Sequence, residues 1–120
     1  MKVRWALLLV CALVAAESWG HHSVSMYDMA HPITVTGVVT KVAWMNPHGY
    51  LYLNVKNQKG ETENWAIEID SPNFLRHNGW TRTTVKEGDT ISCTGGRAKN
   101  GALTMRCTLV KLANGLELRS

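Results

Sequence analysis

The sequence predicts a small, mostly β domain with one short helix near its middle. From residue 33 onward, apolar and polar residues alternate in short segments rich in Val, Thr and Tyr, the pattern of half-buried strands. Clusters of Gly, Asn, Pro and Asp separate these segments and indicate turns. One stretch, residues 71–79, carries the start and stop signals of a helix instead. The expected order is therefore three strands, one helix and two strands.

The first expected strand covers residues 33–44 and is rich in Val and Thr. Its alternation slips, because Val39 and Val42 both suit the core yet lie three positions apart. A β-bulge near Thr40 and Lys41 would restore the phase and bend the strand. We therefore expect a long, curved first strand.

The second and third expected strands are regular. Residues 50–56 and 64–69 alternate cleanly, and turns at residues 46–49 and 57–60 precede and separate them. The side chains expected to face inward are Leu51, Leu53, Val55, Trp65, Ile67 and Ile69. Those expected to face outward are Tyr50, Tyr52, Asn54, Asn64, Ala66 and Glu68.

The helix signals follow directly after the third strand. Ser71 suits the N-cap, because its hydroxyl can accept a hydrogen bond from a free backbone amide of the first turn. Pro72 suits the first helical position and Gly79 suits the stop. The sequence therefore predicts a helix over residues 72–78.

The last two strands complete the order of a small barrel. Residues 86–89 form a turn into a fourth strand, and residues 95–101 form a polar, glycine-rich loop before a fifth. The apolar residues in phase on these strands are Ile91, Cys93, Leu103, Met105, Cys107 and Leu109. This order is typical of an OB-fold, a five-stranded, partly open barrel. An SH3-like barrel or another small β-roll is the alternative.

The first 20 residues have the layout of a secretory signal peptide, with a basic start, an apolar run and small residues after it. Cleavage after Gly20 would make His21 the amino terminus, whereas cleavage after Ala16 would leave further residues ahead of it. The apolar run is shorter than the roughly 20 residues that a membrane span needs. We therefore expect a periplasmic or secreted protein with no membrane span after cleavage.

The rest of the chain reads as an extended N-terminal arm, residues 21–32, and one barrel domain, residues 33–120. The chain has 13 Lys and Arg residues against 9 Asp and Glu residues, a formal net charge of +4. Because these charges are scattered along the sequence, we expect no nucleic-acid partner.

Cysteine usage agrees with export from the cytoplasm. Cys11 lies in the predicted signal peptide, which leaves Cys93 and Cys107 as a pair in the barrel domain. Both lie in the apolar phase of predicted strands, so in an oxidising compartment they could form one cross-strand disulfide. Two buried thiols that act as small apolar side chains are the alternative.

Several motifs cover nearly the whole chain after the signal peptide. They are His21-His22-Ser23, Trp44-Met45-Asn46-Pro47-His48, Asn64-Trp65-Ala66, Ser71-Pro72-Asn73-Phe74-Leu75, Gly79-Trp80-Thr81-Arg82 and Glu87-Gly88-Asp89. Together they resemble an uncharacterised family of short secreted bacterial proteins, domain of unknown function 6152. The resemblance implies a periplasmic or secreted β-rich domain and no particular activity.

The arm concentrates side chains that bind transition metals. They are His21, His22, Met26, Met29 and His31. Imidazoles suit Cu(II) and thioethers suit Cu(I). A terminal His21 would chelate a metal through its amine and ring, similar to the histidine brace of secreted copper proteins, and His48 in its proline-fixed turn is the candidate for the further imidazole. The alternative is an unstructured arm whose histidines only titrate near neutral pH.

Aromatic and polar side chains also gather around the first turn. They are Trp44, Asn46, His48, Tyr50 and Tyr52. In an OB-fold this loop borders the usual ligand face, and aromatic rings there stack on a sugar or a base. A non-catalytic ligand- or protein-binding module is therefore the alternative to copper binding, and self-assembly through an open strand edge is a third function. The opposing interpretation is that these rings only fill and cover the barrel.

The sequence favours a binding protein over an enzyme. Glu68 and Asp70 are the closest carboxylate pair, and the sequence pairs neither with a nucleophile. Gly95-Gly96 lacks the residues that complete a phosphate-binding loop. Copper redox chemistry is the one enzymatic activity that the arm suggests.

Overall fold

The computed structural model describes the backbone of residues 22–120 and the side chains from Val24 onward, so the predicted signal peptide and His21 lie outside it. The helices are α1 (His22–Ser25) and α2 (Pro72–His77). The strands are β1 (Ile33–Ala43), β2 (Tyr50–Lys56), β3 (Thr62–Glu68), β4 (Thr90–Arg97), β5 (Thr104–Lys111) and β6 (Glu117–Arg119). Within this part of the chain, neither helix has the length and apolar character needed to cross a bilayer.

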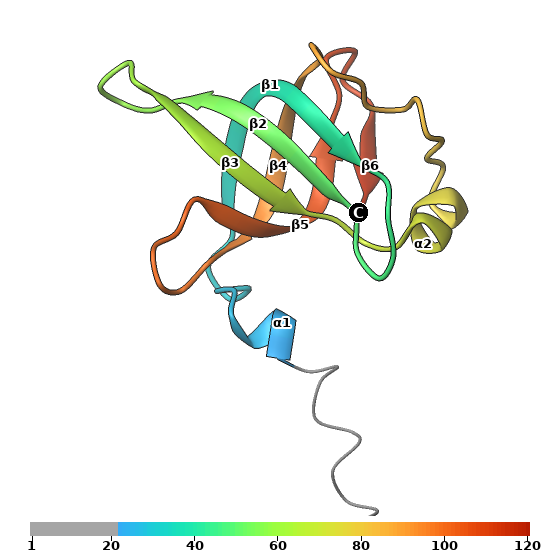
Figure 1. The fold of residues 1–120 in the computed structure, drawn as a ribbon, viewed down its shortest axis with the longest axis horizontal. Coiled ribbons are helices and arrows are strands. Elements are labelled where there is room, and N and C mark those ends of the chain that lie inside the picture. The colour runs from blue at the N-terminus through green and yellow to red at the C-terminus, as the bar shows by residue number, and fades with distance from the viewer. Residues whose placement is uncertain (1–21) are drawn as a thin grey trace, which may run out of the picture.

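The strands form one sheet in the order β3-β2-β1-β4-β5-β6, and a parallel pairing of β3 with β5 closes the first five strands into a barrel. Figure 1 shows this barrel, with α2 beside one end and α1 outside it beyond β5. Because α2 connects β3 to β4, the helix stands where the sequence predicted it. The predicted five-stranded, OB-like barrel is confirmed.

The first strand is curved for the reason that its sequence indicated. The register of β1 against β2 shifts between Val39 and Lys41, which confirms the predicted bulge. Gly37 also lies close against β2, since a Cβ there would overlap the carbonyl oxygen of Asn54. The curved strand pairs with β2 at one end and β4 at the other.

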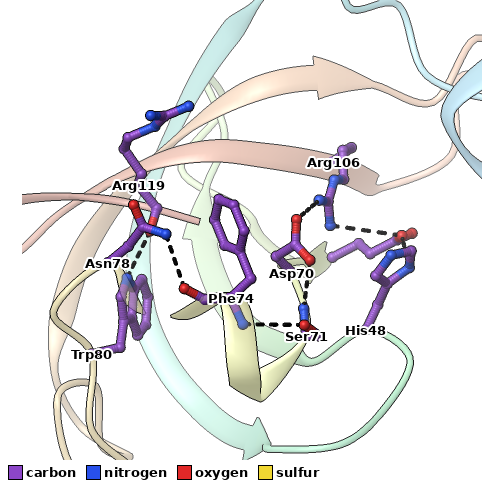
Figure 2. Close-up of polar contacts among 9 residues, drawn as sticks. His48, Asp70, Ser71, Phe74, Asn78, Trp80, Arg106 and Arg119 are labelled. Atoms are coloured by element: carbon purple, nitrogen blue, oxygen red, sulfur yellow. Dashed lines mark hydrogen bonds and ion pairs between the residues drawn. The ribbon is translucent and has the colours of Figure 1, made fainter. Parts of the chain in front are cut away.

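The helix α2 begins at the predicted residue and ends at His77, one residue before the predicted end at residue 78. The Ser71 hydroxyl accepts a hydrogen bond from the Phe74 amide at 3.2 Å, and Pro72 occupies the first helical turn. The chain then turns at Gly79, where φ is +90°. Trp80 follows, and its indole nitrogen donates to the Arg119 carbonyl at 2.8 Å (Figure 2). This contact ties the helix to the end of the chain.

The core fills the inside of the barrel. All six side chains predicted to face inward on β2 and β3, or directly after β3, are buried, as are the cysteines of β4 and β5. Trp65 and Trp80 are buried and Trp44 is partly buried against the same core. The largest fully buried side chains are Leu51, Leu53, Ile67, Ile69, Leu75, Ile91 and Met105.

Two segments differ from the sequence-based prediction. β4 continues through Gly95 and Gly96 to Arg97, where a loop was expected. The glycines permit close packing there, since a Cβ on Gly95 would overlap the Arg106 carbonyl and one on Gly96 would crowd Asp28. A sixth strand, β6, also pairs with β5, although the sequence predicted only five. Its three residues are too few to show an alternation.

The N-terminal arm is not extended in its described part, which corrects the prediction. α1 forms one helical turn, and Tyr27 then pairs with Ala98 as an isolated β-bridge. The Asp28 amide donates to the Arg97 carbonyl at 2.9 Å, and the Lys99 amide donates to the Met26 carbonyl at 2.9 Å. The arm is therefore fastened to the end of β4, because its single large aromatic residue is buried there.

Candidate functional site

A buried carboxylate lies on the outer face of the barrel. The side chain of Glu68, the last residue of β3, is only 5% exposed. Its Oε1 lies 2.7 Å from Nδ1 of His48, and its Oε2 accepts a hydrogen bond from the Tyr27 hydroxyl at 2.7 Å. Because a buried charge is costly without partners, these two contacts hold the loop and the arm on one carboxylate.

The strand register explains why these residues meet. Glu68 stands opposite Tyr50 of β2 on one side and Arg106 of β5 on the other. His48 lies just before β2, and the loop that carries it is fastened to the end of β3 through Gly49. The Gly49 amide donates to the Asp70 carbonyl at 3.2 Å, and the Ile69 amide donates to the Gly49 carbonyl at 2.9 Å. His48 is thereby held at the edge of the sheet.

A second carboxylate and a guanidinium complete the cluster. Arg106 is 13% exposed, and its Nη2 donates to Asp70 Oδ2 at 2.8 Å (Figure 2). Its Nη1 lies 3.9 Å from Glu68 Oε1 and has no hydrogen-bond partner among the described residues. Asp70 Oδ1 accepts from the Ser71 amide at 2.7 Å. We call Tyr27, His48, Glu68, Asp70 and Arg106 the Glu68 cluster.

The Glu68 cluster favours added positive charge. It holds two carboxylates against one guanidinium, so its fixed charges sum to a net negative value when His48 is neutral. Burial, and then the hydrogen bond to Glu68, raises the pKa of Tyr27 to about 12. Burial, and then the charge of Glu68, raises the pKa of Tyr50 as well. Both phenols therefore stay neutral across the physiological range, and a cation at His48 would balance the cluster.

The orientation of the His48 ring leaves one nitrogen available. A carboxylate only accepts hydrogen bonds, so Nδ1 carries the proton that faces Glu68. In a neutral ring, Nε2 then holds its lone pair on the other side, and the side chain is 31% exposed. A carboxylate on the rear nitrogen fixes the tautomer and raises the basicity of a metal-binding histidine. The pair is suited to bind a metal ion or to accept a proton.

Among the described residues, none of the other predicted metal ligands belongs to the Glu68 cluster. His21 and the side chain of His22 lie outside the described residues. Met26 is exposed, and Met29 lies against Gly96. His31 is exposed and contacts Asp28 at 3.1 Å, and this hydrogen bond lowers the pKa of that carboxyl. Within the described part, no group of three or more His, Cys, Asp or Glu side chains is arranged to hold a metal ion.

The predicted ligand-binding residues fall into two groups, the stacked tyrosines of β2 and the residues of the preceding turn. Tyr50 and Tyr52 stack with ring centroids 6.3 Å apart, and the Lys41 amine lies 5.6 Å from the Tyr52 centroid. Asn46 is exposed, whereas Trp44 is partly buried with an indole nitrogen that has no partner among the described residues. A depression of about 380 Å³ lies on this side of the barrel. Its lining, which we call the Tyr52 face, is Thr40, Lys41, Tyr52, Leu53, Asn64, Trp65 and Ala66.

Four members of the Glu68 cluster, Tyr27, Glu68, Asp70 and Arg106, were not identified as site residues from the sequence. The alternation of β3 correctly placed Glu68 on the outer face, but it offered no partner for this carboxylate. Tyr27 had no periodic pattern around it, and Arg106 was one of several scattered basic residues. A buried carboxylate next to a turn histidine becomes visible only when β3, β5 and the arm are assembled.

Comparison with known protein families identifies the family of this chain. A family model described as a family of unknown function, DUF6152, matches residues 8–106. The chain belongs to this family. The match covers the whole Glu68 cluster of the DUF6152 chain, from Tyr27 to Arg106. No curated protein matches its sequence.

Proposed function

We propose that this DUF6152 protein binds a copper-type transition-metal ion through Nε2 of His48 and the histidines of its N-terminal arm. One observation carries the proposal. Tyr27 of the arm and His48 of the loop bind the two oxygens of the same carboxylate, Glu68. The arm and the loop histidine are therefore held close together by the fold.

The chemistry of His48 supports a metal ligand. Glu68 accepts a hydrogen bond from Nδ1, so the ring is held with the lone pair of Nε2 on its other side. The net negative charge of the Glu68 cluster adds attraction for a cation, and its low exposure weakens the screening of that attraction by water. Imidazole nitrogens suit copper, nickel and zinc, and the arm thioethers favour copper among these.

The arm has the length to complete the site. Five positions separate His22 from Tyr27, which is at most about 17 Å of chain. The helical turn α1 shortens this reach, so the backbone of His22 stays near Tyr27. If secretion frees the amine of His21, that residue would add an amine and an imidazole to His48. His22 would offer a further imidazole, and Met26 or Met29 an optional soft ligand.

The test begins with the chain secreted by a bacterial host and purified without chelator. Intact-mass measurement establishes whether the chain starts at His21. Cu(II) titration and electron paramagnetic resonance then compare wild type with His48→Ala and His77→Ala. His77 is the matched control, because it lies on α2 and its ring forms a hydrogen bond with the Asn73 carbonyl, outside the Glu68 cluster.

We expect wild type and His77→Ala to bind Cu(II) alike, whereas His48→Ala loses at least about tenfold in affinity, the range seen even for outer-shell residues. One alanine inserted before His21 should weaken binding as well, because it removes the terminal chelate. Equal affinity of wild type and His48→Ala would exclude His48 as a ligand.

A second candidate is ligand binding at the Tyr52 face. The observation that favours it is a stacked pair of tyrosines with a lysine over one ring, next to a depression on the strands that OB-folds use for ligands. Such a surface suits a sugar ring. Tyr52→Ala should abolish capture of immobilised neutral oligosaccharides. Thr36→Ala, which changes an exposed side chain of β1, should leave this capture unchanged. Unchanged capture by Tyr52→Ala would exclude this face.

A further inference from the structure

Two cysteines face each other inside the barrel. Cys93 of β4 and Cys107 of β5 are both fully buried, and both are free thiols. The Cys107 thiol donates to the Leu109 carbonyl at 3.2 Å, and each cysteine shifts the pKa of the other, as neighbouring thiols do. The pair lies on the inner side of the strands, whereas the Glu68 cluster lies on the outer side, so it takes no part in the proposed metal site.

The strand register brings the two thiols together. Cys93 stands opposite Val110, and Gly95 stands opposite Cys107, with a shift in register between Thr94 and Gly95. Gly95 has no side chain, so the backbone of β5 packs closely against it at Arg106 and Cys107. The two core-facing cysteines are therefore diagonal neighbours on adjacent strands, and a disulfide between them requires a local shift of the backbone where the register changes.

The structure does not favour metal binding or nucleophilic catalysis by the two cysteines. Within the described residues no group of His, Cys, Asp or Glu completes a metal site around them. Contact with Cys107, and then burial, raise the pKa of the Cys93 thiol, whereas contact with Cys93 lowers the pKa of the Cys107 thiol. A catalytic thiol also needs access to its substrate, and both cysteines have none.

We propose that Cys93 and Cys107 form a dithiol that closes to a disulfide between β4 and β5 by exchange with a small-molecule disulfide. One cysteine thiolate first attacks the external disulfide, forms a mixed disulfide and releases one thiol. The second thiolate then attacks the protein sulfur of that bond and releases the second thiol. The protein loses two protons and two electrons, and the external disulfide is reduced to two thiols.

The bond would strengthen the segment on which the arm docks. The closed loop runs from residue 93 to residue 107 and includes Ala98, the bridge partner of Tyr27. A loop of about 15 residues is long enough for a marked stabilisation. Because both thiols are buried, the exchange takes place during folding or after local opening, and the folded protein then shields the bond.

The experiment refolds the reduced full chain in oxidised and reduced glutathione, with a chelator present so that copper plays no part. Remaining thiols are alkylated and the chain is digested with trypsin. We expect the peptides 87–97 and 107–111 to appear as one linked species. Recovery of both peptides in alkylated form, or linkage of either to Cys11, would overturn the proposal.

Thermal unfolding supplies the second measurement. Oxidised wild type and oxidised Cys11→Ser should both melt on the order of 10 °C above their reduced forms, as a loop of this length implies. Cys93→Ala should show no such difference. A linked wild type that melts at the same temperature in both forms would overturn the stabilising role. None of these outcomes depends on metal binding.

Discussion

The Glu68 cluster and the Tyr52 face hold their charged groups in opposite environments, one buried and the other exposed. In the Glu68 cluster, each of the four carboxylate oxygens of Glu68 and Asp70 has a partner within the fold. On the Tyr52 face, Lys41 is exposed and rests over an aromatic ring without an ion pair among the described residues. The difference shows what burial demands. Charges that leave water must be paired and positioned, whereas exposed ones stay free to meet a ligand.

The comparison also separates two kinds of binding. The Glu68 cluster is organised before any ligand arrives, and it offers one nitrogen, Nε2 of His48, in a fixed direction. The Tyr52 face offers area and stacking without a buried charge. A metal ion needs the first kind of site, because ligand direction sets its geometry. A sugar ring suits the second.

The largest expected effect comes from removing the shared carboxylate. Glu68→Ala leaves His48, Tyr27 and Arg106 without their common partner, and breaking such a buried pairing typically costs about 3–5 kcal/mol. Urea unfolding of the folded chain measures this loss. Glu87→Ala is the matched control, because Glu87 is exposed in a turn and should stay within about 0.5 kcal/mol of wild type. A loss of unfolding free energy in Glu68→Ala that is no larger than in the control would show that the cluster does not stabilise the fold.

The next effect is the loss of one hydrogen bond from the arm. Tyr27→Phe keeps the buried ring and removes the hydroxyl that donates to Glu68, so we expect about 1.5–3 kcal/mol of destabilisation. Hydrogen exchange of the Asp28 and Lys99 amides should rise together, since both fasten the arm to β4. Tyr52→Phe is the control. Equal protection of these amides in wild type and Tyr27→Phe would mean that Glu68 does not hold the arm.

The pH dependence follows from the raised pKa of Tyr27. Its pKa is about 12 in the folded chain against 10 for a free phenol, so folding favours the neutral form. This stabilisation is fully present below pH 10 and is lost as the pH rises through about 12. Tyrosinate absorbance should show a last titration step that is missing in Tyr27→Phe. A wild-type titration that is complete near pH 10 would contradict the buried contact.

The smallest effect is expected on the Tyr52 face. Lys41→Gln removes an exposed cation over an aromatic ring, a contact of about 0.5–1 kcal/mol at such sites. Urea unfolding should therefore move little, and Cu(II) affinity should not move at all. A large loss of stability in Lys41→Gln would erase the distinction between the two patches.

Much of the fold was predictable because its signals are local. The alternation along β2 and β3 defined the core face, the slip between Val39 and Val42 located the bulge, and Ser71 with Pro72 located α2. The local sequence led to a wrong prediction at two glycines, because glycine occurs both in loops and in strands that pack closely against a neighbour. Gly95 and Gly96 read as a loop, yet they belong to β4, because a neighbouring strand and the arm pack too closely for a side chain.

The candidate site was predictable only in pieces. His48 stood out because a proline-containing turn carries it, and Glu68 was placed on the correct face of its strand. That these two residues meet depends on the loop between β1 and β2 returning against the end of β3. The approach of Tyr27 depends on the docking of the arm on β4.

The sequence by itself determined which residues face the core, where the chain turns and where the helix begins, because side-chain period, capping and turn preference act over a few neighbouring residues. Only the tertiary structure decided that Tyr27, His48 and Arg106 converge on Glu68. Arg106 reaches Glu68 through the parallel pairing of β3 with β5, which joins residues 38 positions apart. The assembled barrel buries the carboxylate of Glu68 where β3 pairs with β5. Because a buried charge is costly without partners, Glu68 requires the hydrogen bonds and ion pairs that the fold supplies.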